Sequence, residues 1–276
     1  MTRILACIDS TNASPAVCDY AAWASLNFGL PLTLLNVVNR PSCMETQPGS
    51  LAHMLDSMTL DERRHERALK QGYLMLQNAR ERAITDGVMK PELRQKNGEL
   101  LCQLLEMEND MRWLVMGKQS SLYPLLNQLE KIIDALHKPI LVTPTTFKAP
   151  RSLVLAYDAS EVTHMGVEML AASPILKNLA VHLVMVAAKT PKNLEQLDSA
   201  EAILKTVGCD VRTAICDGKV NLALQAYQTE HNIDLLVMGA FSHSRAHRFW
   251  LGSTTSRMIR TTTHPLLFLP KSHLNM

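Results

Sequence analysis

The sequence predicts an α/β protein with two tandem doubly wound domains, each built on a parallel five-stranded sheet. Short apolar segments alternate along the chain with amphipathic helical patterns, and the same order of segments occurs twice. Strand-like segments such as Leu235–Met238 are apolar on both faces. This pattern is typical of a parallel sheet covered by helices on either side, with right-handed crossovers between its strands.

The internal repeat can be followed from segment to segment. A strand that ends at Asp9 in the first half corresponds to one that ends at Asp158 in the second, and a helical pattern follows each. Further strands recur in the same order, and the matching pairs are Leu32–Val38 with Val181–Ala187, Trp113–Gly117 with Leu235–Gly239, and His137–Pro144 with His264–Pro270. Self-similarity on this scale indicates two copies of one domain.

Two prolines mark the seam between the copies. Pro144 and Pro150 bracket a short segment, as prolines do where one element ends and the next begins. We therefore expect domains at residues 1–146 and 151–276. We expect them to pack as an intramolecular pseudo-dimer, and the sequence leaves open whether the chain also forms a homodimer.

The last strand of each copy, Ile140–Val142 and Leu266–Leu269, is the edge expected to make the contact between the copies. The copies differ after their second strand, where Asn39–Gly87 is much longer than its counterpart. Its apolar segment Leu51–Met58 and charged run Asp61–Arg67 predict an extra helix, as a lid or a packing arm.

Composition excludes several classes of protein. The 276 residues are 47% apolar and 20% charged, the net charge is +2, and only 5% are aromatic, so neither a nucleic-acid partner nor a base-stacking surface is expected. No apolar run approaches the roughly 18 residues that span a bilayer, and no signal peptide is evident. The six cysteines form no C-x-x-C pair, which favours free, mostly buried thiols and a cytoplasmic location.

Two residues of the second copy lie at strand ends where ligands bind in open α/β sheets. Asp158 ends the first strand, and its carboxylate can accept hydrogen bonds from a ribose hydroxyl or an adenine amine. The alternative is that Asp158 caps the following helix or turn. Val186 ends the second strand, where its backbone N–H and C=O could pair with an adenine edge.

The strongest pattern comes later in the second copy. A glycine- and serine-containing loop leaves one strand, and after a spacer a second such loop opens the last helix. Glycine allows close approach of a ligand, and a helix N-terminus attracts phosphate through its free N–H groups and its macrodipole. The candidate residues in these two loops are Gly239, Ser242, His243, Arg245, Gly252, Ser253 and Thr254.

Gly239-x-x-Ser242, nine residues and then Gly252-Ser253 resemble the ATP-binding signature of the universal stress protein family, G-x-x-G-x9-G-[ST]. The resemblance extends over nearly the whole chain in two copies. It implies an adenine nucleotide alpha hydrolase-like fold that binds ATP, ADP or AMP. It also implies that Asp158 and Val186 hold the adenosine end. The residues implied to line the ribose and phosphates are Gly239, Ser242, His243, Gly252, Ser253 and Thr254. Arg245 is added for its charge alone.

Both copies depart from this pattern. Ser242 stands where the family usually has glycine, at a cost of about 1 kcal/mol if its φ is positive. In the first copy Leu126 and Asn127 replace the glycine and serine of the second loop, and Glu130 adds negative charge nearby. We therefore expect a degenerate nucleotide site in the first copy, although Asp9 persists.

Other chemistries have less support. His243 and His247 are four residues apart, but no glutamate follows the first histidine as in a zincin helix, so no metal site is expected. His182 lies in an apolar strand and is expected to be a hydrogen-bonded core residue. No general base is placed beyond Asp158, so the expectation is a binding protein with at most slow ATPase activity.

Two function classes remain. One is an ATP-binding protein of stress response or signalling, whose nucleotide lies in the second copy with or without Mg²⁺. The other is a nucleotide-independent protein-interaction scaffold of the same fold.

Overall fold

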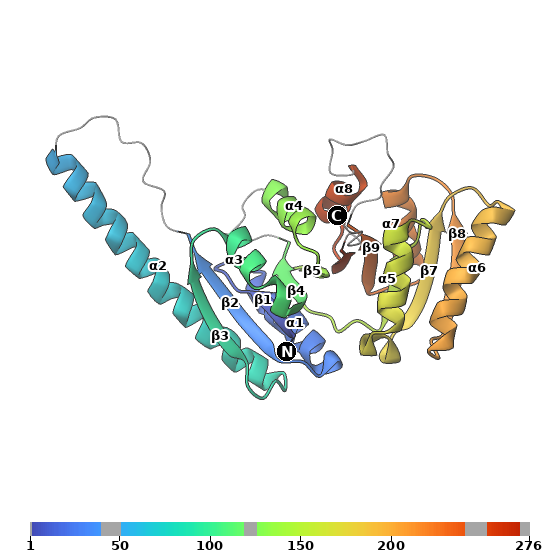
Figure 1. The fold of residues 1–276 in the computed structure, drawn as a ribbon, viewed down its shortest axis with the longest axis horizontal. Helices are drawn as coiled ribbons and strands as arrows, with labels where there is room; N and C mark the ends of the chain where they lie inside the picture. Colours follow the sequence, from blue (N-terminus) through green and yellow to red (C-terminus); the bar gives the residue numbers. More distant parts are fainter. Residues whose placement is uncertain (1, 40–50, 119–125, 241–252, 271–276) are drawn as a thin grey trace.

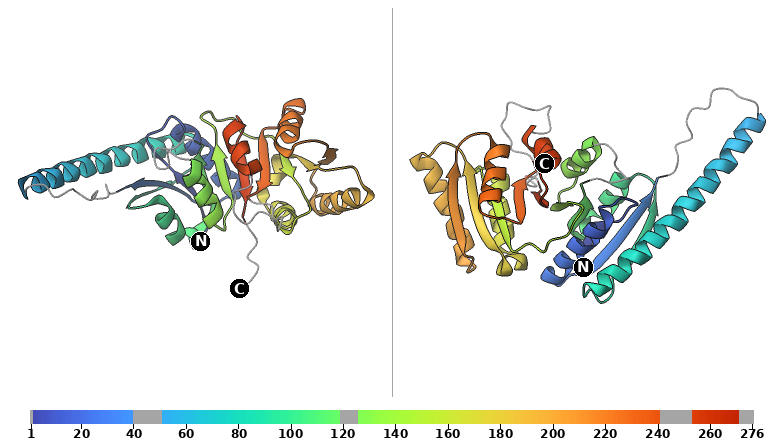
Figure 2. Two further views of the ribbon diagram at one scale, coloured as in Figure 1. Left: turned by 90° about the horizontal axis from the view of Figure 1, so that it is seen from above. Right: turned by 180° about the vertical axis from the view of Figure 1, so that it is seen from behind.

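The structure is a computed structural model. It describes residues 2–39, 51–118, 126–240 and 253–270, and of residues 51–60, 126, 127, 253 and 254 the backbone alone. Two repeats of alternating strands and helices lie side by side (Figures 1 and 2). The predicted α/β class is confirmed.

The first repeat contains five strands, which are β1 (Arg3–Cys7), β2 (Leu32–Val38), β3 (Glu92–Asn97), β4 (Met111–Gly117) and β5 (Ile140–Thr143). Its helices are α1 (Ser14–Phe28), α2 (Leu51–Thr85), α3 (Leu100–Glu106), the 3-10 turn η1 (Glu108–Asp110) and α4 (Leu126–Ala135).

The second repeat follows the same order. Its strands are β6 (Ser152–Ala156), β7 (Ala180–Val186), β8 (Val211–Cys216), β9 (Leu235–Gly239) and β10 (Leu266–Leu269). Its helices are α5 (Glu161–Ala171), the 3-10 turn η2 (Pro174–Asn178), α6 (Pro191–Thr206), α7 (Val220–Glu230) and α8 (Ser253–Thr261).

The two sheets join into one. The ten strands are ordered β3-β2-β1-β4-β5-β10-β9-β6-β7-β8, and every pairing is parallel except the central one between β5 and β10. At this join Leu266 pairs with Val142 and Phe268 with Ile140. The prediction that the last strand of each copy makes the contact is confirmed. Each half reverses its strand order once, between β1 and β4 and between β6 and β9.

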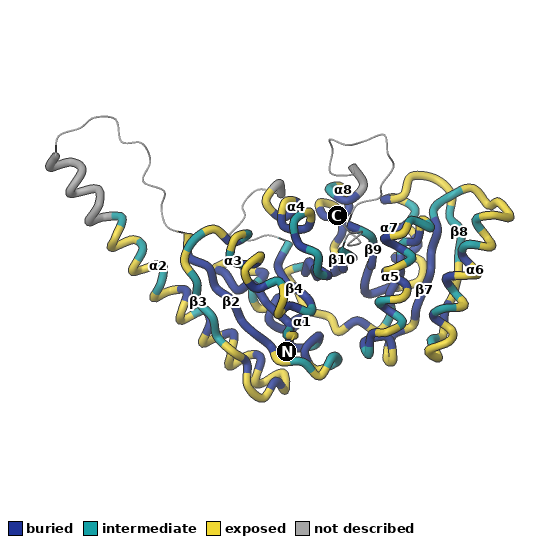
Figure 3. The backbone as a smooth tube through the Cα atoms, in the orientation of Figure 1, coloured by how far each residue is buried: buried dark blue, intermediate teal, exposed yellow. Residues whose placement is uncertain are grey.

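The core has two layers, one on each face of the sheet, and both run through both halves. Helices α1, α2, α5 and α6 contribute to one layer, while α3, α4, α7 and α8 contribute to the other. The central strands are almost wholly buried (Figure 3). This burial explains the continuous apolar runs in their sequences.

The long segment after β2 does not form a separate extra helix. Residues 51–85 are one continuous α-helix of 35 residues, which packs beside β2, β3 and α1 and extends past the sheet (Figure 1). Leu76, Ala79 and Ala83 are buried where this helix covers the sheet. The predicted helical character is therefore correct, but the segment lengthens the helix that the repeat already has at this place.

The segment between the halves is fixed by contacts to both. The Phe147 ring packs edge-on against Tyr20 of α1, at 4.7 Å between ring centroids. The next residue, Lys148, pairs with the buried carboxylate of Asp234, its Nζ lying 2.5 Å from Oδ1. The cysteines described are all free thiols, and burial raises the pKa of Cys7 and of Cys18 to about 12.

Candidate functional site

Asp158 lies two residues beyond the end of β6 with an exposed side chain. Its Oδ1 accepts hydrogen bonds from the backbone N–H of Ser160 at 3.0 Å and from the Thr163 hydroxyl at 2.8 Å. One carboxylate oxygen thus performs the capping role that sequence offered as the alternative. Among the described residues none donates to Oδ2, so the second oxygen can accept from a ligand.

The turn after Asp158 is strained. Ala159 has φ +56°, a left-handed conformation that costs a non-glycine residue about 1 kcal/mol. Ser160 then caps α5, accepting the Thr163 N–H through its side chain. The strained turn and the cap together fix the carboxylate of Asp158 beyond the end of β6.

Val186 directs its backbone N–H and C=O toward the end of β6, where Asp158 lies. Tyr157 N–H donates to Val184 C=O, while Ala187 N–H donates to Cys216 C=O on the opposite side. Because successive residues of a strand direct their peptide groups to alternate sides, the N–H and C=O of Val186 point to the β6 side. The β6–β7 pairing ends before Val186, since its last register pair is Ala156 with Val184. These two groups are therefore aimed past the end of β6, as an adenine edge would require.

Gly239 ends β9 next to the first turn of α5. A Cβ at this position would lie 3.2 Å from Val162 Cγ1 and 3.6 Å from Thr163 Cγ2. Since Thr163 also binds Asp158, the missing side chain of Gly239 brings the end of β9 close to the Asp158 turn. A larger residue here would separate them.

Helix α8 begins at Ser253, as the sequence predicted, and its start is tied to β9. The buried Thr255 hydroxyl donates to the carbonyl of Ala240 at 3.2 Å, and Ala240 N–H donates to Leu269 C=O at 3.1 Å. The first backbone N–H groups of α8 therefore lie at the same sheet edge as Asp158 and Val186.

The remaining predicted site residues fall outside the part of the chain that the structure describes. Ser242, His243, Arg245 and Gly252 lie outside the described residues, as do the side chains of Ser253 and Thr254. His247 lies outside them as well. Within the described part of the chain there is no group of three or more potential metal-ligating side chains.

The first half repeats the aspartate turn. Asp9 Oδ1 accepts from the N–H of Thr11 at 2.9 Å, as Asp158 does from Ser160, and also from the hydroxyls of Thr11 and Ser14. Asp9 is, however, only 6% exposed. The same hydrogen bond from the residue two positions later is thus made to a buried carboxylate in one half and to an exposed one in the other.

Two other residues can now be placed. Glu130 is buried on α4, and its Oε1 accepts a hydrogen bond from the Ser256 hydroxyl of α8, a partner that the sequence did not reveal. His182 is buried with Nδ1 2.9 Å from the Tyr227 hydroxyl, which confirms it as a hydrogen-bonded core residue. Burial, with His231 and Arg212 nearby, lowers the pKa of His182.

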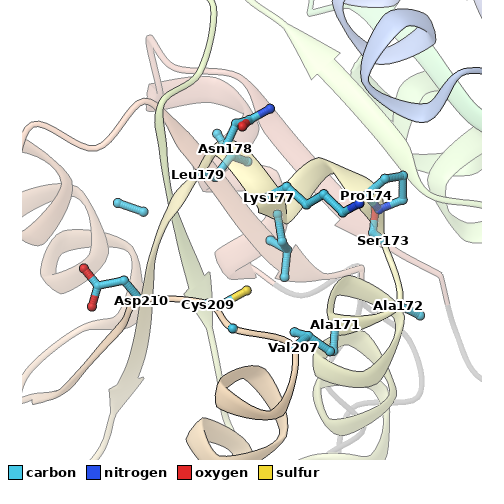
Figure 4. Close-up of a pocket in the computed structure, with 13 residues that line it drawn as sticks. Ala171, Ala172, Ser173, Pro174, Lys177, Asn178, Leu179, Val207, Cys209 and Asp210 are labelled. Atoms are coloured by element: carbon cyan, nitrogen blue, oxygen red, sulfur yellow. The ribbon is translucent and has the colours of Figure 1, made fainter.

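A separate hollow of about 650 Å³ lies at the opposite end of the second half (Figure 4). It is lined by residues 171–174, 176–180 and 207–210. Ala180 begins β7 and Val186 ends it, so the hollow lies about 20 Å from the Asp158 edge along that strand. It is not part of the candidate site.

Two joined doubly wound halves of one strand order define a tandem α/β repeat protein. The sequence model of the universal stress protein family matches residues 1–144 and again 150–270. The chain therefore belongs to the universal stress protein family, in a two-copy arrangement, which confirms the resemblance seen in the sequence.

Known proteins similar to this chain cover both copies. Universal stress protein Slr1230 of Synechocystis is 28% identical over 97% of this chain and 99% of its own. A universal stress protein structure from Archaeoglobus fulgidus matches 99% of this chain and 97% of its own with a TM-score of 0.71 at 18% identity. A putative universal stress protein from Pseudomonas aeruginosa covers 98% of this chain and 93% of its own, with a TM-score of 0.62 at 13% identity. These structures support the fold.

No described helix combines the length and apolarity needed to cross a lipid bilayer.

Proposed function

We propose that this chain binds an adenine nucleotide, ATP or its di- or monophosphate, in residues 151–276. The observation that carries the proposal is the convergence at one sheet edge of the free Asp158 oxygen, the Val186 peptide and the start of α8. A carboxylate and a strand-end peptide suit the ribose and adenine, and a helix start suits phosphate.

The order of these groups gives the nucleotide a direction. Adenine pairs with the N–H and C=O of Val186, and the ribose hydroxyls donate to Asp158 Oδ2. The phosphates then extend past Gly239 to the N–H groups at the start of α8. In this proposal Ser242, His243 and Arg245 of the intervening loop, with Gly252, Ser253 and Thr254, line the phosphate end.

The same proposal leaves residues 1–146 without a nucleotide. Asp9 is buried and already holds several donors, and Leu126 with Asn127 stands where the second half has glycine and serine. The chain thus acts as a cytoplasmic nucleotide-dependent stress or signalling protein, in which one half carries the ligand.

The test is the nucleotide content of the full-length protein. We expect ATP, ADP or AMP to be released from the purified, denatured wild type, and ATP to bind in calorimetry with and without Mg²⁺. Gly252→Leu places a side chain where the phosphates would lie, so ATP affinity should fall by about a hundredfold or more.

The matched control is Leu126→Gly, the reverse change in the other half, which should leave ATP affinity unchanged. Unchanged nucleotide content in Gly252→Leu would reject the site. A wild type that binds no adenine nucleotide would leave the scaffold function in its place.

A further inference from the structure

Lys118 occupies a position of the first half that corresponds to Ala240 of the second. Each residue directly follows the glycine that ends its strand, Gly117 of β4 or Gly239 of β9. Lys118 N–H donates to Thr143 C=O at 2.9 Å, as Ala240 N–H does to Leu269 C=O. The backbones match, but one half has a long cation where the other has a methyl group.

The ammonium group of Lys118 crosses into the second half. Its Nζ donates to the carbonyls of Arg260 and Thr262, each at 2.9 Å. These carbonyls lie at the C-terminal end of α8. The last carbonyls of a helix have no partner within it and carry the negative end of its macrodipole, so a lysine placed here satisfies both.

A second contact from the first half holds the flank of the same helix. Glu130 of α4 accepts the Ser256 hydroxyl of α8, and both helices contribute to the same core layer. Met258 and Ile259 of α8 are fully buried in that layer. The half with the degenerate loops therefore supplies polar contacts to the end and to the side of α8.

We propose that Lys118 is a positioning residue for the nucleotide phosphates, acting through α8. This inference rests on the proposed function. Helix α8 has nine residues and is about 13 Å long, so a clamp on its last carbonyls also limits how its first N–H groups can tilt or shift. The ammonium group in addition stabilises the helix macrodipole whose positive end faces the phosphates.

In this proposal the two halves have different roles in nucleotide binding. Residues 1–146 bind no nucleotide of their own but hold the helix that does. Nucleotide binding in the second half and the contact between the halves are then linked, and each stabilises the other.

The experiment compares ATP with adenosine on the full-length protein by calorimetry. Lys118→Met removes the ammonium group and keeps a long apolar side chain, and ATP affinity should fall about three- to tenfold. Adenosine affinity should not change, because Asp158 and Val186 hold that end. Lys118→Arg can still donate to two carbonyls and should restore most of the ATP affinity. Lys90→Met, an exposed lysine of the same half, is the matched control.

The outcomes separate the two proposals. If wild type binds ATP and Lys118→Met binds it as tightly as Lys90→Met does, the role of Lys118 is refuted and the proposed function stands. An equal loss for ATP and adenosine would also refute it, because general destabilisation would explain that result. A wild type that binds neither ligand would overturn the role of Lys118 together with the proposed function.

Discussion

Asp9 and Asp158 each lie two residues beyond the end of equivalent strands, and each accepts a hydrogen bond from the residue two positions later, at 2.9 and 3.0 Å. Their surroundings differ. Asp9 is buried beside hydroxyl donors, whereas Asp158 is exposed to solvent and is followed by Ala159 at φ +56°. The hydrogen bond to the carboxylate thus recurs in both halves, whereas the left-handed residue after it and the exposure of the carboxylate do not. One carboxylate serves the fold, and the other is free to meet a ligand.

The largest expected effect separates these two carboxylates. Asp9→Ala should lower the free energy of unfolding by about 3 kcal/mol, because the partly buried donors of Thr11 and Ser14 lose a charged acceptor. Asp158→Ala should cost stability less but lower ATP affinity about tenfold or more. Urea unfolding and calorimetry measure the two quantities.

Asp158→Asn is the control for the turn. Its side-chain oxygen can still accept from Ser160 and Thr163, so stability should be close to wild type, while a loss of affinity then reports the charge. Equal losses of ATP affinity in the Asp9 and Asp158 variants would mean that the first half binds nucleotide too.

Much of the fold could be predicted because it depends on local patterns. The aspartates Asp9 and Asp158, the apolar strands and the glycine that ends β4 or β9 appear in the sequence twice. The pairing of β5 with β10 could be expected because each is the last strand of its copy. The continuity of α2 was missed, because the apolar segment Leu51–Met58 and the charged run Asp61–Arg67 suggested an extra helix instead of one helix of 35 residues.

The candidate site could be predicted only in part. The sequence placed Val186 at a strand end, but the direction of its peptide groups depends on the register with β6 and β8. The hydrogen bond from Lys118 to Thr262 joins residues 144 positions apart, so no local sequence pattern predicts it. Likewise, the hydrogen bond that Glu130 accepts comes from Ser256 in the other half, which the sequence did not predict.

A smaller effect should distinguish two helical glycines, one in each half. A Cβ on Gly72 of α2 would lie 2.1 Å from Asn36 Oδ1 and 2.6 Å from Gln95 Nε2. Asn36 is buried and donates to Ile8 C=O, so the amide pair cannot move without losing hydrogen bonds. Gly72→Ala should therefore cost about 2 kcal/mol of stability, measured by urea unfolding.

Gly166 of α5 is the comparison. Its Cβ would lie 2.2 Å from Leu269 Cδ1, the end of a flexible side chain, while the gain of about 1 kcal/mol in helix propensity is the same at both positions. Gly166→Ala should thus cost less than Gly72→Ala, and adding Leu269→Val should reduce its cost further. A larger loss in Gly166→Ala would show that the core next to β10 is the more rigid of the two.

The smallest expected effect is a dependence of stability on pH that belongs to the second half. His182 of β7 is buried against Tyr227 and His231, and its ring centroid lies 5.6 Å from that of His231. Burial, then His231 and Arg212, lower the pKa of His182, while Asp210 opposes them. The equivalent position in the first half is Thr33, which does not titrate.

The direction in which pH changes the free energy of unfolding follows from the difference in the pKa of His182 between the folded and unfolded states. Unfolded histidine takes up a proton near pH 6.5, whereas folded His182 resists protonation until lower pH. The free energy of unfolding should therefore fall as pH drops below about 6.5, until the folded pKa is reached.

His182→Gln keeps a hydrogen-bonding group for Tyr227 without the titration, so its stability should fall less over this range. His164→Gln, which changes a half-exposed histidine of α5, is the control and should behave as wild type. Hydrogen exchange at pH 5.5 should show the loss in β7 and α7 before β2, and the reverse order would contradict this assignment.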